Sequence, residues 1–241
     1  MKKTLCAILC YNNENTLSKV IEEKKKLKGV CDFIFINDGS KDNSAKVLKS
    51  SKFITLNHKK NMGYGQAVKS AFKYARNKKY HYLAIFPADN QRHVEDLIRM
   101  IKTIEQSSID LIVGSKYKIL KKIPFYRKIG NIFFSNIAKK LWNCKIADVL
   151  SGFKIYKTKS FYKHLHILPN DYSFDITLSQ LVSFKKMKFK ELHVNCRYNK
   201  NTSSMMGIFK LHKKNILFIG LKMIIDTLVF YFNYKFNHNY K

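Results

Sequence analysis

The chain has 241 residues, and 46 lysines and arginines against 16 aspartates and glutamates give it a formal net charge of +30. This length is enough to bury a core, and the lack of a long Pro-, Gly- or Ser-rich stretch argues for one domain with appendages. The charge favours polyanionic partners such as nucleic acid, anionic lipid or phosphorylated substrates, although an AT-rich coding bias toward Lys would explain part of it.

Apolar runs alternate with helical patterns through the first half of the chain. In chain order they predict strands at 5–10, 33–36, 53–56, 82–86 and 111–113, with helices between them at 16–27, 44–49, 66–75 and 94–104. Repeated strand and helix units form a mostly parallel, doubly wound α/β sheet. Beyond residue 114 the pattern predicts an α+β extension with helices at 125–142 and 174–184 and strands at 153–156 and 189–196.

The last apolar run, 216–232, is interrupted by Lys222 and Asp226, which places it at the edge of a membrane-spanning length. An interfacial helix on an anionic membrane fits better, because further lysines flank the run. The alternative is an ordinary core or dimer helix. We therefore expect a main domain at 1–204 and an apolar C-terminal helical segment at 205–241.

The five cysteines are scattered through the chain, and their odd number argues against a disulfide framework. Cys6 and Cys10 lack the partner pair that a zinc site needs. The apolar run near the N-terminus is too short for the hydrophobic region of a signal peptide. These features predict a reduced, cytoplasmic location.

The most informative segment is Pro87-Ala88-Asp89-Asn90-Gln91, which follows the strand at 82–86 and precedes a helix. Ligands of open α/β sheets bind outside the carboxyl ends of the strands. Asp89 and the amide oxygen of Gln91 are therefore candidate ligands for a divalent cation.

Three other loops follow predicted strands at the same edge: Tyr11-Asn12-Asn13-Glu14, Asn37-Asp38-Gly39-Ser40 and Asn61-Met62-Gly63-Tyr64-Gly65. Each alone is a weak signal, because aspartate and glycine also serve ordinary turns. Together they are compatible with a sugar-nucleotide site.

The ordered set of these loops resembles family 2 glycosyltransferases, most of all their dolichyl- or polyprenyl-phosphate sugar synthase branch. Two later segments extend the likeness, Gly114-Ser115-Lys116-Tyr117 and Ser151-Gly152-Phe153-Lys154. The resemblance implies a GT-A fold that inverts the anomeric centre of a UDP- or GDP-sugar. The implied acceptor is a polyprenyl phosphate or a cell-surface glycan precursor, and the implied location is peripheral, on the inner face of the cell membrane.

The resemblance also implies roles for individual residues. Asp89, supported by Gln91, would bind Mg²⁺ or Mn²⁺. Asp148 would act as a general base toward a hydroxyl acceptor or would orient a phosphate acceptor, with Asp175 ranked second and an ordinary turn aspartate as the alternative. The nucleotide-sugar positions are Tyr11, Glu14, Asp38, Gly63, Ala88 and Asp89. The acceptor and phosphate positions are Lys116, Arg127, Lys154, Lys200 and Ser203.

One departure from the family pattern is Pro87, which stands where the family commonly has the first aspartate of Asp-x-Asp. Weaker metal affinity is expected, and a catalytically silent scaffold is an alternative. A basic nucleic-acid-binding protein is a further alternative, but no recognition helix, zinc module or RNA-binding aromatic motif supports it, so no nucleic-acid partner is expected. A homo-oligomer is compatible with the sequence.

Overall fold

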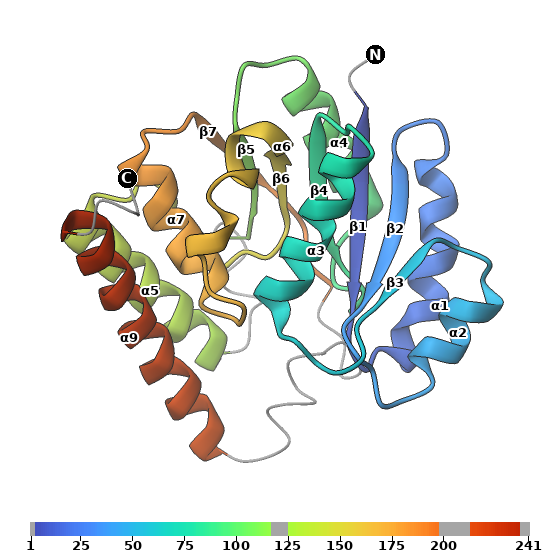
Figure 1. The fold of residues 1–241 in the computed structure, drawn as a ribbon, viewed down its shortest axis with the longest axis horizontal. Helices are drawn as coiled ribbons and strands as arrows, with labels where there is room; N and C mark the ends of the chain where they lie inside the picture. The colour runs from blue at the N-terminus through green and yellow to red at the C-terminus, as the bar shows by residue number, and fades with distance from the viewer. Residues whose placement is uncertain (1–2, 117–124, 198–212, 237–241) are drawn as a thin grey trace.

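The structure is a computed structural model that describes residues 3–116, 125–197 and 213–236, without the side chains of residues 24, 125–129 and 213–217. The described residues form a seven-stranded sheet of order β3-β2-β1-β4-β6-β5-β7 with helices on both faces (Figure 1). The strands are β1 (Thr4–Cys10), β2 (Asp32–Asn37), β3 (Thr55–Asn57), β4 (Tyr82–Pro87), β5 (Leu111–Ser115), β6 (Lys154–Lys157) and β7 (Phe189–His193).

Strands β1 to β4 are parallel to one another, and β5 is parallel to β7, which confirms the mostly parallel α/β sheet. The exception is β6, which lies antiparallel between β4 and β5. The predicted segments are all present, and most of their ends are shifted by a few residues.

The helices are α1 (Glu14–Glu23), α2 (Ser44–Ser50), α3 (Tyr64–Asn77), α4 (Val94–Glu105), α5 (Phe125–Trp142), α6 (Thr158–Tyr162), α7 (Phe174–Phe184) and α9 (Lys213–Phe236), with 3-10 turns η1 (Lys24–Leu27) and η3 (Leu165–Ile167). Successive side chains of a strand point to opposite faces, so β1 sends Leu5 and Ala7 into one core cluster and Cys6 and Ile8 into the other. The first cluster is covered by α3, α5, α6, α7 and α9, and the second by α1, α2 and α4.

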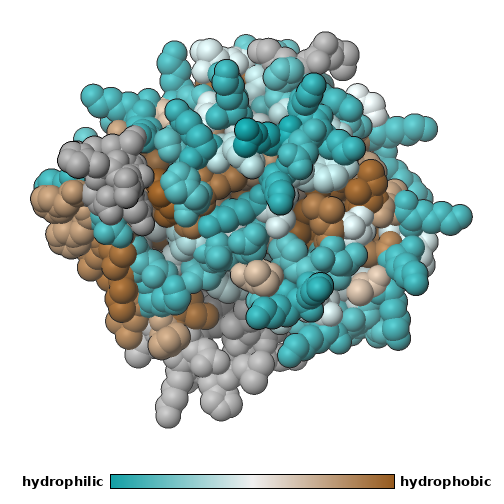
Figure 2. Space-filling model, viewed as in Figure 1, coloured by the Kyte–Doolittle hydropathy of each residue, from teal (hydrophilic) through white to brown (hydrophobic). Residues whose placement is uncertain are grey.

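Helix α9 is apolar on two sides. Met223 and Phe230 are buried in the first core cluster, and α9 packs against α7. The opposite side carries a stripe of exposed apolar residues at helical spacing, comprising Phe218, Leu221, Ile225, Leu228, Val229, Phe232 and Phe236. Figure 2 shows hydrophobic side chains gathered over α9 on a surface that is otherwise mostly hydrophilic. Within the described ranges, no helix is both long and apolar enough to cross a membrane.

Candidate functional site

The carboxyl ends of β1, β2 and β4 meet at one edge of the sheet because the three strands are parallel neighbours. Two backbone hydrogen bonds continue the pairing past the strands, from Asp38 N to Cys10 O and from Ala88 N to Leu9 O, both 2.9 Å. The loops that carry Tyr11, Asp38 and Asp89 therefore leave the sheet side by side. This edge is the candidate donor site.

Asp38 is buried and organises the turn that precedes α3. Its carboxylate accepts hydrogen bonds from Met62 N (2.9 Å), Gly63 N (3.0 Å) and Asn61 Nδ2 (3.1 Å). His58 Nδ1 lies 2.6 Å from the same carboxylate, and His58 Nε2 lies 2.9 Å from Ser70 Oγ. Asp38 thus shapes the donor edge through the 61–63 backbone, and its contact with a nucleotide stays a prediction.

Glu14 braces the first two loops. Its carboxylate accepts hydrogen bonds from Asn43 N (2.9 Å) and Asn43 Nδ2 (3.0 Å), while Glu14 N donates to Asp42 Oδ2 (3.0 Å). Tyr11, at the start of the same loop, is half-buried. The Tyr11 to Glu14 loop is therefore fixed to the turn before α2, which leaves Tyr11 as the better candidate for a nucleotide contact.

The glycines of the 61–65 loop serve close packing against the loop that follows η3. A side-chain carbon at Gly63 would lie 2.5 Å from Asn170 O, and one at Gly65 would lie 2.4 Å from Pro169 O. Gly63 also has a φ of +94°, which L side chains rarely adopt. Packing between two loops accounts for this Gly-x-Gly pattern, and a phosphate contact at Gly63 stays a prediction.

We expect Gly65→Ala to lower the free energy of unfolding by about 1–3 kcal/mol, because the new methyl group overlaps the Pro169 carbonyl. The matched control is Gly130→Ala in α5, where a side-chain carbon would meet no described atom within 4 Å. The control should be stabilised by about 0.5–1 kcal/mol, as for glycine to alanine in a helix interior. Chemical denaturation of both variants measures the difference. If Gly65→Ala and Gly130→Ala had the same free energy of unfolding, the loop at 169–170 would not pack against Gly65.

Asp89 is half-buried beyond the end of β4, and its Oδ1 accepts a hydrogen bond from Gln91 N at 3.0 Å. Asn90 between them has a left-handed backbone (φ 56°), which asparagine tolerates. Ala88 is buried at 1% exposure, and its backbone bonds to Leu9 and to the Thr16 hydroxyl. The turn therefore presents Asp89, while the side chain at Ala88 is covered by protein.

This donor set fits a cation that is shared with a bound diphosphate. Among the described residues, no three His, Cys, Asp or Glu side chains gather as a metal cage. Mg²⁺ usually keeps several waters and takes one or two carboxylates together with substrate phosphates. Asp89 can supply the carboxylate, whereas Gln91 is 6% exposed and contributes to the turn through its backbone N–H.

Arg197, in the segment that follows β7, links that segment to the Asp89 turn. The sequence alone did not single out Arg197. Its guanidinium bonds to Glu23 Oε1 (2.5 Å) and Asn90 Oδ1 (3.1 Å), and its backbone N–H donates to Gln91 O (2.9 Å). The predicted contacts Lys200 and Ser203 come from the same region, but which residue reaches the Asp89 turn depends on tertiary structure.

Asp148 is completely buried. Its carboxylate accepts hydrogen bonds from Lys116 N (3.0 Å) and Asn131 Nδ2 (2.9 Å), and its backbone N–H donates to Glu191 Oε1 (3.1 Å). These contacts join the end of β5 to α5 and β7. In this arrangement the carboxylate faces protein, so we propose that Asp148 positions Lys116 instead of contacting the acceptor.

Lys154 is also completely buried, and its ammonium pairs with Asp175 Oδ1 at 2.6 Å and with the Ser151 carbonyl. The Lys154 ammonium therefore has internal partners in this arrangement, and its contact with a phosphate stays a prediction. Burial raises the pKa of the Asp175 carboxyl, against the opposing effect of Lys154. The Tyr64 hydroxyl lies beside the pair, since a side-chain carbon at Gly152 would be 3.0 Å from it and 3.6 Å from Asp175 Oδ2.

Three predicted phosphate contacts involve side chains that the structure does not describe. Arg127 belongs to α5, but its side chain is not among the described ones. Lys200 and Ser203 lie outside the described residues. Their roles stay predictions.

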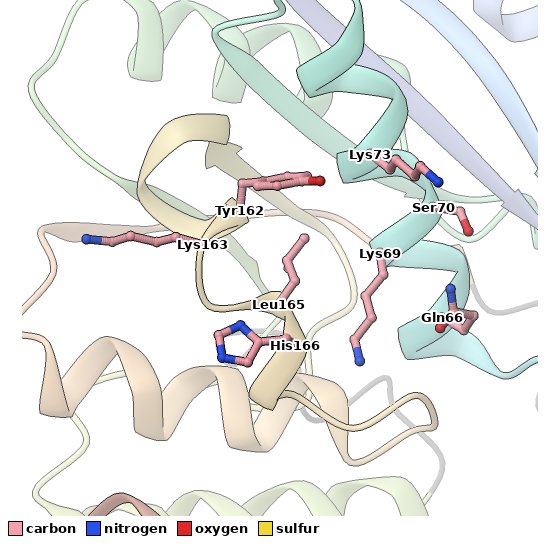
Figure 3. A pocket seen from close by; sticks show the side chains of 8 residues that line it. All are labelled: Gln66, Lys69, Ser70, Lys73, Tyr162, Lys163, Leu165 and His166. Atoms are coloured by element: carbon pink, nitrogen blue, oxygen red, sulfur yellow. The ribbon is translucent and has the colours of Figure 1, made fainter. Parts of the chain in front are cut away.

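A separate pocket of about 370 Å³, here called the outer pocket, lies between α3 and the segment that contains α6 and η3 (Figure 3), and none of the predicted site residues lines it. Its lining comes from α3 and from the segment containing α6 and η3, and includes Lys69, Lys73, Lys163 and His166. Lys69 also donates to Leu168 O (2.5 Å) and Asn170 Oδ1 (2.6 Å), so it holds the loop that packs on Gly63 and Gly65.

Comparisons with known proteins identify relatives of this chain. The chain is 25% identical over 246 residues to a UDP-N-acetylglucosamine–dolichyl-phosphate N-acetylglucosaminyltransferase of Methanococcus voltae, covering 91% of this chain and 96% of that protein. It is 27% identical over 212 residues to a dolichyl-phosphate beta-glucosyltransferase of Dictyostelium discoideum, covering 77% of this chain and 63% of that one.

Among solved structures, glucosyl-3-phosphoglycerate synthase of Mycobacterium tuberculosis, in complex with Mn²⁺, UDP and glucosyl-3-phosphoglycerate, superposes with a TM-score of 0.68. The likeness covers 95% of this chain and 80% of that one at 14% identity, so it supports the GT-A-like fold alone. The family model "Glycosyl transferase family 2" matches residues 6–165, and the chain belongs to that family.

Proposed function

We propose that this protein transfers a sugar from a UDP-sugar to a polyprenyl phosphate, with inversion at the anomeric carbon. The observation that carries the proposal is the convergence of the Tyr11, Asp38 and Asp89 loops at the carboxyl edge of β1, β2 and β4. The relative in Methanococcus voltae, which is named for a UDP-sugar donor and a dolichyl-phosphate acceptor, supports this choice of substrates.

The proposed reaction is a single displacement. A phosphate oxygen of the acceptor attacks the anomeric carbon, a new carbon–oxygen bond forms, and UDP departs with the electron pair of the broken bond. The acceptor is already an anion at neutral pH, so no general base is required. The complete burial of Asp148 is compatible with this acceptor, since the carboxylate has no proton to remove.

Asp89 is the residue that would hold Mg²⁺ or Mn²⁺ together with the diphosphate. The cation would neutralise the charge that develops on the departing UDP. The Gln91 N–H fixes one oxygen of Asp89, which leaves the orientation of the carboxylate defined before the donor binds.

The direct test incubates purified protein with UDP-glucose or UDP-N-acetylglucosamine, Mg²⁺ or Mn²⁺, and undecaprenyl phosphate in detergent. UDP and lipid-linked sugar should appear in equal amounts, and a chelator should stop both. Absence of UDP release and of lipid-linked sugar with every UDP-sugar would reject the proposal and favour a catalytically silent scaffold.

We further propose that the exposed stripe of α9 lies on an anionic membrane surface. Seven large apolar side chains share one side of this helix, and the whole chain carries a net charge of +30. Apolar burial at the headgroup boundary and attraction to anionic lipid reinforce each other in such helices. This orientation would bring the protein to the layer where a polyprenyl phosphate resides.

We expect Ile225→Asp to weaken vesicle binding by at least about tenfold, since a buried isoleucine side chain is worth about 1.5–3 kcal/mol. Flotation with vesicles of phosphatidylglycerol and phosphatidylcholine measures the bound fraction. Ile225 is 59% exposed, and the matched control is Ile54→Asp, which is 57% exposed near β3. The control should bind vesicles like the wild type. If both variants lost the same fraction of vesicle binding, the exposed stripe of α9 would not be the membrane-binding surface.

A further inference from the structure

The loop at 168–173, between η3 and α7, reaches the donor edge. Asn170 O accepts a hydrogen bond from Gln66 N (2.9 Å), and the same carbonyl lies against Gly63. Gly63 N in turn donates to Asp38 at 3.0 Å. The 168–173 loop is therefore separated from the Asp38 carboxylate only by the backbone around Gly63, although the loop and Asp38 are far apart in sequence.

Tyr172 is the aromatic residue of this loop. Its ring is parallel to that of Tyr64, with centroids 6.3 Å apart and an interplanar angle of 5°. Burial raises the pKa of the Tyr172 hydroxyl to about 12, and the nearby Tyr11 and Asp38 add to the shift. Tyr172 is thus a neutral tyrosine in the neighbourhood of Tyr11, the candidate for contact with the base.

Helix α9 holds both neighbours of Tyr172. Lys222 Nζ lies 2.6 Å from Asp171 Oδ2 and 2.6 Å from Asp226 Oδ2. Ser173 Oγ donates to Asp226 Oδ2 at 2.6 Å. A single surface ion pair contributes little to stability. Linked contacts on both sides of Tyr172, however, restrict the conformations of its loop. A restricted loop loses less conformational freedom when a ligand binds.

We propose that Tyr172 forms a wall of the subsite for the donor's nucleobase and that α9 holds it there through Lys222 and Asp226. The proposal rests on the UDP-sugar function proposed above. It gives α9 a second role, because the helix that faces the membrane also shapes the donor site. Tyrosine suits such a wall, since its flat face stacks on a base at small conformational cost.

The test measures UDP affinity by calorimetry in the presence of Mg²⁺. Tyr172→Ala should weaken UDP binding roughly tenfold, the fold-change expected for the loss of one base–aromatic contact. Tyr172→Phe should bind like the wild type, because the ring is kept. The inhibition constant of inorganic pyrophosphate, which has no base, should be the same in the Tyr172→Ala variant as in the wild type.

The role of α9 is tested with Lys222→Met, which should weaken UDP binding several-fold while the melting temperature reports an intact fold. The matched control is Lys73→Met, an exposed lysine of α3 on the outer pocket (Figure 3). If the folded Tyr172→Ala variant bound UDP as tightly as the wild type, Tyr172 would not contact the nucleobase. If Lys222→Met and Lys73→Met bound UDP with equal affinity, α9 would not position Tyr172. Failure of the wild type to bind UDP would instead reject the proposed function.

Discussion

Asp89→Asn is expected to reduce kcat/KM for UDP release by about a thousandfold, which corresponds to about 4 kcal/mol of lost transition-state stabilisation. Asparagine keeps the shape of the side chain and an acceptor for the Gln91 N–H, which lies 3.0 Å from Oδ1. It removes the negative charge. Pro87 and Ala88 supply no carboxylate to replace it, so affinity for the cation should fall with the activity.

The measurement is UDP release as a function of Mg²⁺ or Mn²⁺ concentration. The matched control is Glu95→Gln, an equally conservative change of an exposed carboxylate at the start of α4 that pairs with Lys26. The control should keep the wild-type rate and metal dependence. Wild-type turnover by Asp89→Asn at low metal concentration would reject the metal role of Asp89.

The elements of this fold were predictable because each one is set by local pattern. The helices at 125–142 and 174–184 have the predicted ends, since apolar spacing and flanking residues decide them. The position of β6 was not predictable in the same way. It follows β5 in sequence, yet it lies between β4 and β5, because strand neighbours are chosen by tertiary packing.

The same division applies to the candidate site. Parallel strands bring their carboxyl ends together, so the grouping of Tyr11, Asp38 and Asp89 followed from the order of elements. The surroundings of Asp148 and Lys154 did not, because their partners Asn131 and Asp175 come from α5 and α7. A motif shows that a charged residue belongs near a site, but only the packing shows whether its charge faces the ligand or the protein.

Lys154→Met is expected to destabilise the protein by about 3–5 kcal/mol, because it leaves the Asp175 carboxylate buried without its partner. Lys154 is 0% exposed, Asp175 is 5% exposed, and their charged atoms are 2.6 Å apart. For a chain of this size each kcal/mol lowers Tm by about 2–4 °C, so a fall of about 10 °C is expected. The control is Lys26→Met, which breaks an exposed ion pair at 2.7 Å and should leave Tm almost unchanged.

The pH dependence of this loss separates a buried charge from lost packing. Without Lys154, burial raises the folded-state pKa of Asp175 further above its unfolded value, so the folded state binds the extra proton. A raised carboxyl pKa stabilises the folded state at low pH, and that stability is lost as pH rises through the folded pKa. The gap between wild type and Lys154→Met should therefore be wider at pH 8 than at pH 5. If the difference in free energy of unfolding between wild type and Lys154→Met did not change with pH, the lysine would act through packing of its side chain and not through its charge. The double variant Lys154→Met/Asp175→Leu would then be no more stable than Lys154→Met.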